Sequence, residues 1–135
     1  MKHTKNIEDY LEVIYIISEE KKIDPVRTKD LAKRLEVYPS TVSEMIKKLI
    51  EMKLVVKVGH GSIKLTDSGR ERARRVLKNH RLLECFFYQY LGINNNKAKN
   101  TICKIEHHIN EEIFNVLYEK LGRPKSCPHG NPIPI

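Results

Sequence analysis

Three stretches of the sequence carry side chains of the types that bind metal ions, spaced three or four residues apart. They are Cys103 with Glu106 and His107, His80 with Glu84, and Asp9 with Glu12. On an α-helix this spacing places side chains above one another on a single face. Three such helices can converge on one divalent cation without any loop, so the pattern predicts a shared metal site.

Burial separates this hypothesis from a simpler one. Ile102, Ile105 and Ile109 form an apolar stripe on a helix predicted over 97–109, and the polar side chains of the motif lie beside that stripe. Ionisable groups are costly to bury unless they are paired or bound to a metal. The alternative is that each His–Glu pair is a surface ion pair or a hydrogen-bonded histidine of the core. Spacing alone leaves both interpretations open.

A second pattern, between residues 28 and 53, predicts two helices joined by a short turn. Thr28 is predicted as the N-cap of the first of these helices. Pro39 begins the second, and Thr41 with Glu44 has the spacing of a capping box. The second helix has a clean apolar stripe, which leaves its hydroxyl and lysine side chains facing outward.

The surrounding elements extend this pair into a larger motif. A helix is predicted from about Ile7 to Glu20, and residues 54–58 and 62–65 are predicted as two strands joined by a glycine-containing turn. Helix, helix and then hairpin is the order of a winged helix-turn-helix. We therefore expect a DNA-binding unit with a small β-hairpin wing.

The outward side chains of the second helix suit the major groove of DNA. Small polar groups near a helix N-terminus can reach base edges, while lysines contact phosphates. The hairpin, with Lys57, His60 and Lys64, would lie against the neighbouring backbone or minor groove. The alternative is a packed helix pair with an ordinary solvated face. The predicted DNA-contacting residues are Thr28, Pro39, Ser40, Thr41, Ser43, Lys47 and Lys48.

The second half of the chain reads as helices followed by a tail. Thr66 is predicted to cap a long helix that ends near Tyr90, and further helices are expected over 97–109 and 111–121. The tail from Gly122 holds four of the six prolines and is predicted to be an extended arm or linker. Cys127 and His129 in this tail offer a possible accessory metal site, although a packed linker explains them more simply.

The composition limits the partners and the compartment. Lys and Arg number 25 against 17 Asp and Glu, a formal net charge of +8 that suits a polyanion without identifying one. No apolar run approaches the roughly 20 residues of a membrane span, and the N-terminus lacks the apolar core of a signal peptide. Three cysteines without framework spacing favour a reduced setting. We therefore expect a cytoplasmic protein with no membrane partner.

Six motifs together resemble a known family essentially from end to end. The sequence is similar to the metal-dependent transcriptional repressors of the diphtheria toxin repressor and manganese transport regulator family. The motifs are Glu8-Asp9-Tyr10-Leu11-Glu12, Val37-Tyr38-Pro39-Ser40-Thr41-Val42-Ser43, Leu65-Thr66-x-x-Gly69, His80-x-Leu82-Leu83-Glu84, Glu106-His107-His108 and Gly130-Asn131-Pro132-Ile133-Pro134.

This resemblance implies a set of metal ligands. Asp9 and Glu12 match the carboxylate pair of the manganese branch. His80, Glu106 and His107 match ligands that both branches use. The resemblance also implies repression of metal-uptake genes by a homodimer that binds a double-stranded DNA operator, with no small-molecule substrate.

Two positions depart from a single branch of the family. Cys103 matches the cysteine of the iron branch, where the manganese branch has a glutamate. Glu84 matches a second-site ligand of the iron branch, but the histidine of that site falls at Lys99. A thiolate with an imidazole and carboxylates suits Fe²⁺, Co²⁺, Ni²⁺ or Zn²⁺, whereas Mn²⁺ prefers more oxygen. Because the cellular pool decides among them, we expect Fe²⁺ or Mn²⁺ as the sensed ion, with Zn²⁺, Co²⁺ or Ni²⁺ able to occupy the site in vitro.

The overall expectation is a mostly α protein with a small β-hairpin wing. A winged helix-turn-helix DNA-binding domain is predicted at 1–70, a helical metal-binding and dimerisation domain at 71–123 and a Pro-rich C-terminal tail at 124–135. Two other classes compete with a metal-dependent regulator. One is a metal-independent or thiol-responsive winged-helix regulator, in which Cys103 or Cys85 is oxidised. The other is a small metallohydrolase, which is disfavoured because the sequence offers no base or oxyanion device besides the ligands, so we expect no enzyme activity.

Overall fold

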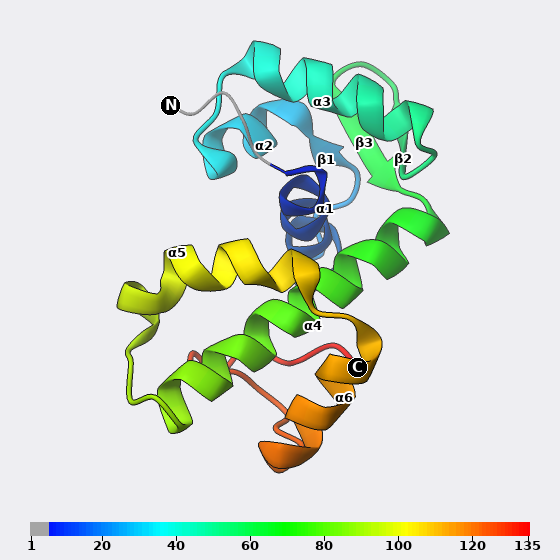
Figure 1. Cartoon of the computed structure of the whole chain (residues 1–135). Coiled ribbons are helices and arrows are strands. Elements are labelled where there is room, and N and C mark those ends of the chain that lie inside the picture. The colour runs from blue at the N-terminus through cyan, green and yellow to red at the C-terminus, as the bar shows by residue number, and fades with distance from the viewer. Residues whose placement is uncertain (1–5) are drawn as a thin grey trace. The chain divides into compact units, whose positions relative to one another are not determined.

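A computed structural model describes residues 6–135 and divides the chain into two compact units. The first unit ends at Ala73, and the second spans Arg74–Ile135. The predicted fold class, mostly helical with a small β element, is confirmed (Figure 1). Among the described residues, no helix is both long and apolar enough to cross a membrane.

The first unit opens with helix α1, Ile7–Tyr15, which continues as a π-helix over Ile16–Glu20. Asn6 and Asp9 cap its start reciprocally: Asn6 Oδ1 accepts from the backbone N–H of Glu8 at 2.8 Å, and Asp9 Oδ2 accepts from that of Asn6 at 2.9 Å. The residues of α1 that are buried in the core are Tyr10, Leu11 and Ile14. Asp9 therefore has a structural role at the N-terminus of α1.

The predicted helix pair is present as α2, Thr28–Leu35, and α3, Pro39–Glu51. The predicted N-cap at Thr28 and the predicted capping box of Thr41 with Glu44 were both wrong. Arg27 is the N-cap of α2, and the Thr28 hydroxyl donates to the carbonyl of Gly61 at 3.4 Å instead of to its own helix. Pro39, whose φ suits the first helical position, starts α3 directly after the N-cap Tyr38, so Thr41 already lies inside the helix.

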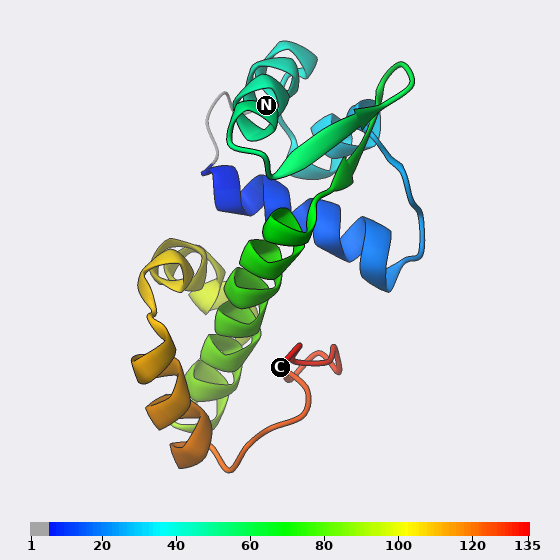
Figure 2. The same cartoon turned by 90° about the vertical axis from the view of Figure 1, so that its right-hand side faces the viewer.

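The β element is a three-stranded antiparallel sheet rather than a simple hairpin. Strands β2, Val55–Val58, and β3, Ser62–Leu65, form the predicted hairpin, which projects outward in Figure 2. Strand β1, Val26–Arg27, was missed because two residues carry no alternation, and it pairs with the other edge of β3. This pairing fixes the chain where it enters α2.

Helix α4, Asp67–Gln89, begins in the first unit, and its residues from Arg74 onward belong to the second. The predicted cap is confirmed, because Thr66 Oγ1 accepts from the backbone N–H of Gly69 at 3.1 Å. Helix α5, Asn95–Ile105, is capped by Asn94, and helix α6, Glu111–Lys120, is capped by Asn110. The helix predicted over 97–109 ends earlier than expected, since Glu106–His108 form a 3₁₀ turn.

The C-terminal tail is not the extended arm that its prolines suggested. It folds back along α4 (Figure 1). There, Arg81 Nη1 donates to the carbonyl oxygen of Pro132 at 2.5 Å. Ser126 and Pro132 form an antiparallel bridge within the tail, and Ile133 joins an apolar cluster with residues of α4 and α6. These long-range contacts hold the tail, and proline composition alone does not report them.

Candidate metal centre

Three of the predicted ligands lie together in the second unit. His80, Cys103 and Glu106 each offer a ligand atom, and these atoms all lie within 4.8 Å of one another. We call this group the first cluster. His80 Nδ1 lies 2.8 Å from Glu106 Oε1, and Glu106 is only 1% exposed. A carboxylate buried to this degree needs a cation or a strong hydrogen-bond donor beside it, and a sulfur, a nitrogen and an oxygen at this separation form a donor set that suits a divalent transition metal.

Three segments deliver these side chains. His80 lies on α4, Cys103 lies in the last turn of α5, and Glu106 opens the 3₁₀ turn that follows. Glu106 and His107 therefore lie on a 3₁₀ turn and not on the regular α-helix that was expected over 97–109. His107 is half-buried on the same turn, and one of its ring nitrogens lies within 4.8 Å of a Glu106 oxygen. The remaining predicted ligands, Asp9 and Glu12, are half-buried side chains of α1 in the first unit, and their role stays a prediction from the sequence.

A second cluster lies in the same unit and consists of Glu84, Cys127 and His129, again with ligand atoms within 4.8 Å of one another. His129 Nδ1 lies 3.0 Å from Glu84 Oε2, and both Glu84 and Cys127 are buried. The sequence contained the signal for Cys127 and His129 but gave no reason to join them to Glu84. Only the return of the tail along α4 brings the three side chains together.

Glu84 also faces the first cluster. Its Oε1 lies 3.5 Å from His80 Nε2, so the His80 ring has Glu106 at one nitrogen and Glu84 at the other. By contrast, Lys99, which stands where the iron branch has a histidine, is an exposed residue of α5. The partners that the structure gives Glu84 are therefore His80 and the tail.

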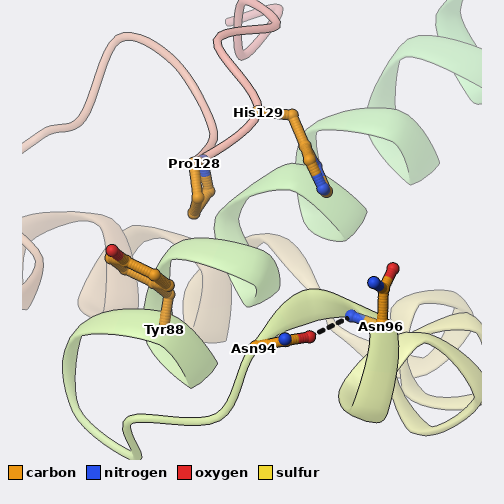
Figure 3. Close-up of a pocket in the computed structure, with 5 residues that line it drawn as sticks. All are labelled: Tyr88, Asn94, Asn96, Pro128 and His129. Atoms are coloured by element: carbon orange, nitrogen blue, oxygen red, sulfur yellow. Dashed lines mark hydrogen bonds between the residues drawn. The ribbon is translucent and has the colours of Figure 1, made fainter.

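The second cluster has an open side. A pocket of about 250 Å³ lies beside His129 and is lined by Tyr88, Asn94, Asn96, Pro128 and His129 itself. Figure 3 shows these five side chains. The side chain of His129 is 54% exposed. Behind this cluster, burial raises the pKa of Cys85 to about 11, with smaller contributions from the neighbouring Cys127 and Glu84. Cys85 is therefore a protonated thiol at neutral pH.

The predicted DNA-contacting residues lie on the first unit. Pro39, Ser40, Ser43, Lys47 and Lys48 are exposed on α3, whereas Thr41 and Thr28 are half-buried. The backbone N–H of Thr28 donates to the Gly61 carbonyl at 2.9 Å, which ties the start of α2 to the hairpin loop. This arrangement joins the loop of the wing to the helix pair.

Comparison with known families assigns both units. Residues 2–62 match the model of the N-terminal DNA-binding domain of iron-dependent repressors, and residues 66–135 match the model of their metal-binding and dimerisation domain. The chain belongs to the iron-dependent repressor family. This is a family of metal-dependent, DNA-binding transcriptional repressors rather than of enzymes, as the sequence motifs predicted.

Individual relatives agree with this assignment. An HTH-type transcriptional regulator of Methanocaldococcus jannaschii is 37% identical over 111 residues, which cover 82% of this chain and 88% of the relative. The diphtheria toxin repressor of Corynebacterium diphtheriae is 35% identical over 127 residues, or 94% of this chain and 55% of that protein.

Solved structures show the same architecture. A manganese-dependent transcriptional repressor in complex with manganese superimposes with a TM-score of 0.84 at 41% identity, covering 96% of this chain and 59% of that one. The manganese regulator SloR superimposes with a TM-score of 0.86 at 34% identity, covering 98% and 60%. This chain therefore spans about three-fifths of the length of these two structures.

Proposed function

We propose that this protein is a transcriptional repressor that binds its operator when Fe²⁺ or Mn²⁺ occupies the second unit, and that it controls genes of metal uptake. The observation that carries this proposal is the first cluster, whose three donor atoms lie within 4.8 Å of one another in the domain matched to metal binding and dimerisation. His80, Cys103 and Glu106 would hold the ion, and His107 is the neighbouring ligand on the same turn.

The choice of ion follows from the donor set. One thiolate and one imidazole favour Fe²⁺, Co²⁺, Ni²⁺ or Zn²⁺ by affinity, whereas the cellular pool favours the ions that are abundant and exchangeable. Related structures contain manganese in one repressor and cadmium or zinc in ScaR. These relatives support a site that accepts several divalent ions in vitro, with Fe²⁺ or Mn²⁺ as the physiological signal.

The second cluster extends the proposal to a second ion. Glu84, Cys127 and His129 repeat the carboxylate, thiolate and imidazole chemistry of the first cluster. The contact of Glu84 with His80 at 3.5 Å links the two groups within one unit. Asp9 and Glu12 remain proposed ligands on the strength of the family motif in α1.

The DNA partner is proposed from the first unit. The exposed side chains of α3 carry hydroxyl groups near the helix N-terminus and lysines one and two turns later, which suits base reading followed by phosphate contact. The family's dimerisation domain implies two copies of this helix, and two-fold operators require a fixed spacing between such helices.

The direct test is a gel-shift titration of operator DNA with Mn²⁺, Fe²⁺, Co²⁺, Ni²⁺ or Zn²⁺, and with excess chelator as the control. Operator fragments are first selected from genomic DNA in the presence of Mn²⁺. We expect tight binding with divalent metal, weak binding in chelator, and an affinity that falls steeply with salt because each phosphate contact releases counterions. Equal affinity in chelator would contradict metal dependence and would favour a thiol-responsive regulator.

A further inference from the structure

A single buried amide holds the turn that carries Glu106. Asn79, on α4, is 3% exposed. Its Nδ2 donates one hydrogen bond to the carbonyl oxygen of Glu106 at 3.0 Å and another to that of Ile109 at 3.1 Å. One side chain is therefore hydrogen-bonded both to the first residue of the 3₁₀ turn and to the residue that follows the turn.

These carbonyls lie where a helix leaves acceptors without partners. The last carbonyl groups of a helix have no donor within that helix and need one from elsewhere. Helix α5 ends at Ile105 and passes directly into the turn, so Asn79 supplies the missing donors from α4. The end of α5 and its metal-binding turn are thereby fixed from a different helix.

The orientation of the amide is determined by its surroundings. Asn79 Oδ1 is buried and accepts no hydrogen bond within the part of the chain that the structure describes. A flipped amide would place this oxygen against two carbonyl oxygens, which would repel it. An unsatisfied buried acceptor costs stability. Asn79 therefore donates both hydrogen bonds to the turn although its own Oδ1 is left without a donor.

Asn79 and its neighbour His80 hold the same residue at two points. Asn79 binds the backbone of Glu106, while His80 Nδ1 lies 2.8 Å from the Glu106 carboxylate. We propose that Asn79 is a positioning residue for the first cluster, because it fixes the backbone from which Glu106 reaches His80 and Cys103. This inference rests on the metal function proposed for that cluster. Mutation of a residue that orients a metal ligand typically lowers metal affinity by about 10- to 100-fold.

The test uses Co²⁺ binding in two backgrounds that isolate the clusters. A thiolate ligand gives Co²⁺ a near-ultraviolet charge-transfer band. In Cys127→Ser this band reports Cys103 in the first cluster, and in Cys103→Ser it reports Cys127 in the second cluster. Into each background we would introduce Asn79→Asp, which keeps the shape but loses both donors. Asn79→Leu would follow, because it removes the hydrogen bonds without adding charge.

We expect both Asn79 substitutions to weaken Co²⁺ binding about ten-fold or more in the Cys127→Ser background and to leave the Cys103→Ser background unchanged. Asn110→Asp is the matched control. Asn110 caps α6 by accepting from the Ile113 N–H at 2.8 Å, and aspartate preserves that acceptor. This control should leave both backgrounds unchanged.

Three results would overturn the inference in distinguishable ways. Equal weakening in both backgrounds would mean that Asn79 supports the whole unit rather than the first cluster. Unchanged affinity in both would mean that Asn79 only fills space. Absence of a thiolate band in Cys127→Ser alone would remove Cys103 from the ligands, and with it the first cluster as defined here and the role proposed for Asn79.

Discussion

At the scale of single residues, Cys103 determines the chemical softness of the first cluster. Its sulfur lies with an imidazole nitrogen and a carboxylate oxygen, all within 4.8 Å of one another. Thiolate ligands bind late transition metals better than they bind Mn²⁺, which prefers oxygen. The side chain at position 103 is therefore the simplest place to change the ranking of metals.

Replacing Cys103 with glutamate should shift this ranking. In Cys103→Glu we expect Mn²⁺ to activate DNA binding at a lower concentration than in the wild type, while Zn²⁺ and Co²⁺ lose affinity. Metal titrations followed by gel shift measure the ranking, and the Co²⁺ charge-transfer band of Cys103 should disappear. Since Cys127 also gives such a band, the comparison is made in the Cys127→Ser background. An unchanged ranking would mean that Cys103 only packs.

Cys85 should be an unreactive thiol. Alkylation requires the thiolate, and burial raises the pKa of Cys85 to about 11, so this cysteine stays protonated at pH 7.5. In the metal-free native protein we expect iodoacetamide to label half-buried Cys103 well before Cys85, with the Cys85 rate rising as the pH approaches 11. Peptide mass spectrometry measures both rates, and urea-unfolded protein is the control. Rapid labelling of Cys85 would revive it as an oxidation sensor.

The lysines and the hydroxyl groups of α3 should contribute differently to DNA binding. Lys47 is exposed and is proposed to contact phosphate, so Lys47→Ala should weaken binding to all sequences and reduce the salt dependence by about one counterion. Ser40→Ala should mainly relax the preference for one base. Binding isotherms on the operator and on point-mutated operators separate the two effects. A Lys47 variant that lost only sequence preference would reverse this assignment.

At the scale of elements, the junction between the wing and α4 leaves no room for a side chain. The carbonyl of Leu54 accepts from the backbone N–H of Thr66 at 3.0 Å, and a Cβ added to Gly69 would lie 2.0 Å from that same oxygen. The Leu54 oxygen is a backbone atom, and it cannot rotate aside as the end of a side chain can. Gly69 is therefore required where α4 passes Leu54, the residue before β2.

Gly69→Ala should destabilise the first unit by about 1–3 kcal/mol or more, in the range of overpacked cores. Urea unfolding followed by circular dichroism measures the change. Ser68→Ala is the matched control, because Ser68 is the exposed neighbour in the same turn of α4. Loss of less than about 0.5 kcal/mol in Gly69→Ala would mean that the junction relaxes at little cost, as ordinary surface positions do.

The elements also show what sequence patterns could and could not predict. Helices α2, α3, α4 and α6 follow from apolar stripes, since burial of one face dictates the spacing. The cap at Thr28 was mispredicted because the pairing of β1 with β3 extends to Arg27 and sets the start of α2. The cap at Thr41 was mispredicted because α3 already begins at Pro39. The second cluster was missed because, like the start of α2, it depends on contacts between segments far apart in the sequence. Its residues meet only after the tail folds back, and local periodicity carries no information about that.

At the scale of the whole molecule, the second unit exposes more apolar surface than one copy can bury. Tyr88, Tyr90, Leu91, Ile113 and Val116 are each 49–62% exposed. This unit matches a dimerisation domain, and most soluble oligomers are symmetric. Pairing of two copies would remove such side chains from water.

We therefore expect a two-fold homodimer both with and without metal. Sedimentation velocity at micromolar concentration, in Mn²⁺ and in chelator, measures the oligomeric state. The same species should appear in both conditions, because the proposed role of metal is to alter the geometry of the dimer rather than to create it. A monomer in the presence of metal would refute this expectation.

The tie between Thr28 and Gly61 has a consequence for the DNA rather than for the protein. Both the N–H and the hydroxyl of Thr28 bond to the Gly61 carbonyl, so the loop of the wing cannot swing independently of α2. Because this DNA-binding surface has a fixed shape, the duplex must adapt its groove width and curvature to it. The energy of that deformation depends on base sequence. Operators should consequently be selected in part at base pairs that no side chain touches, where flexible steps make the required bend cheap.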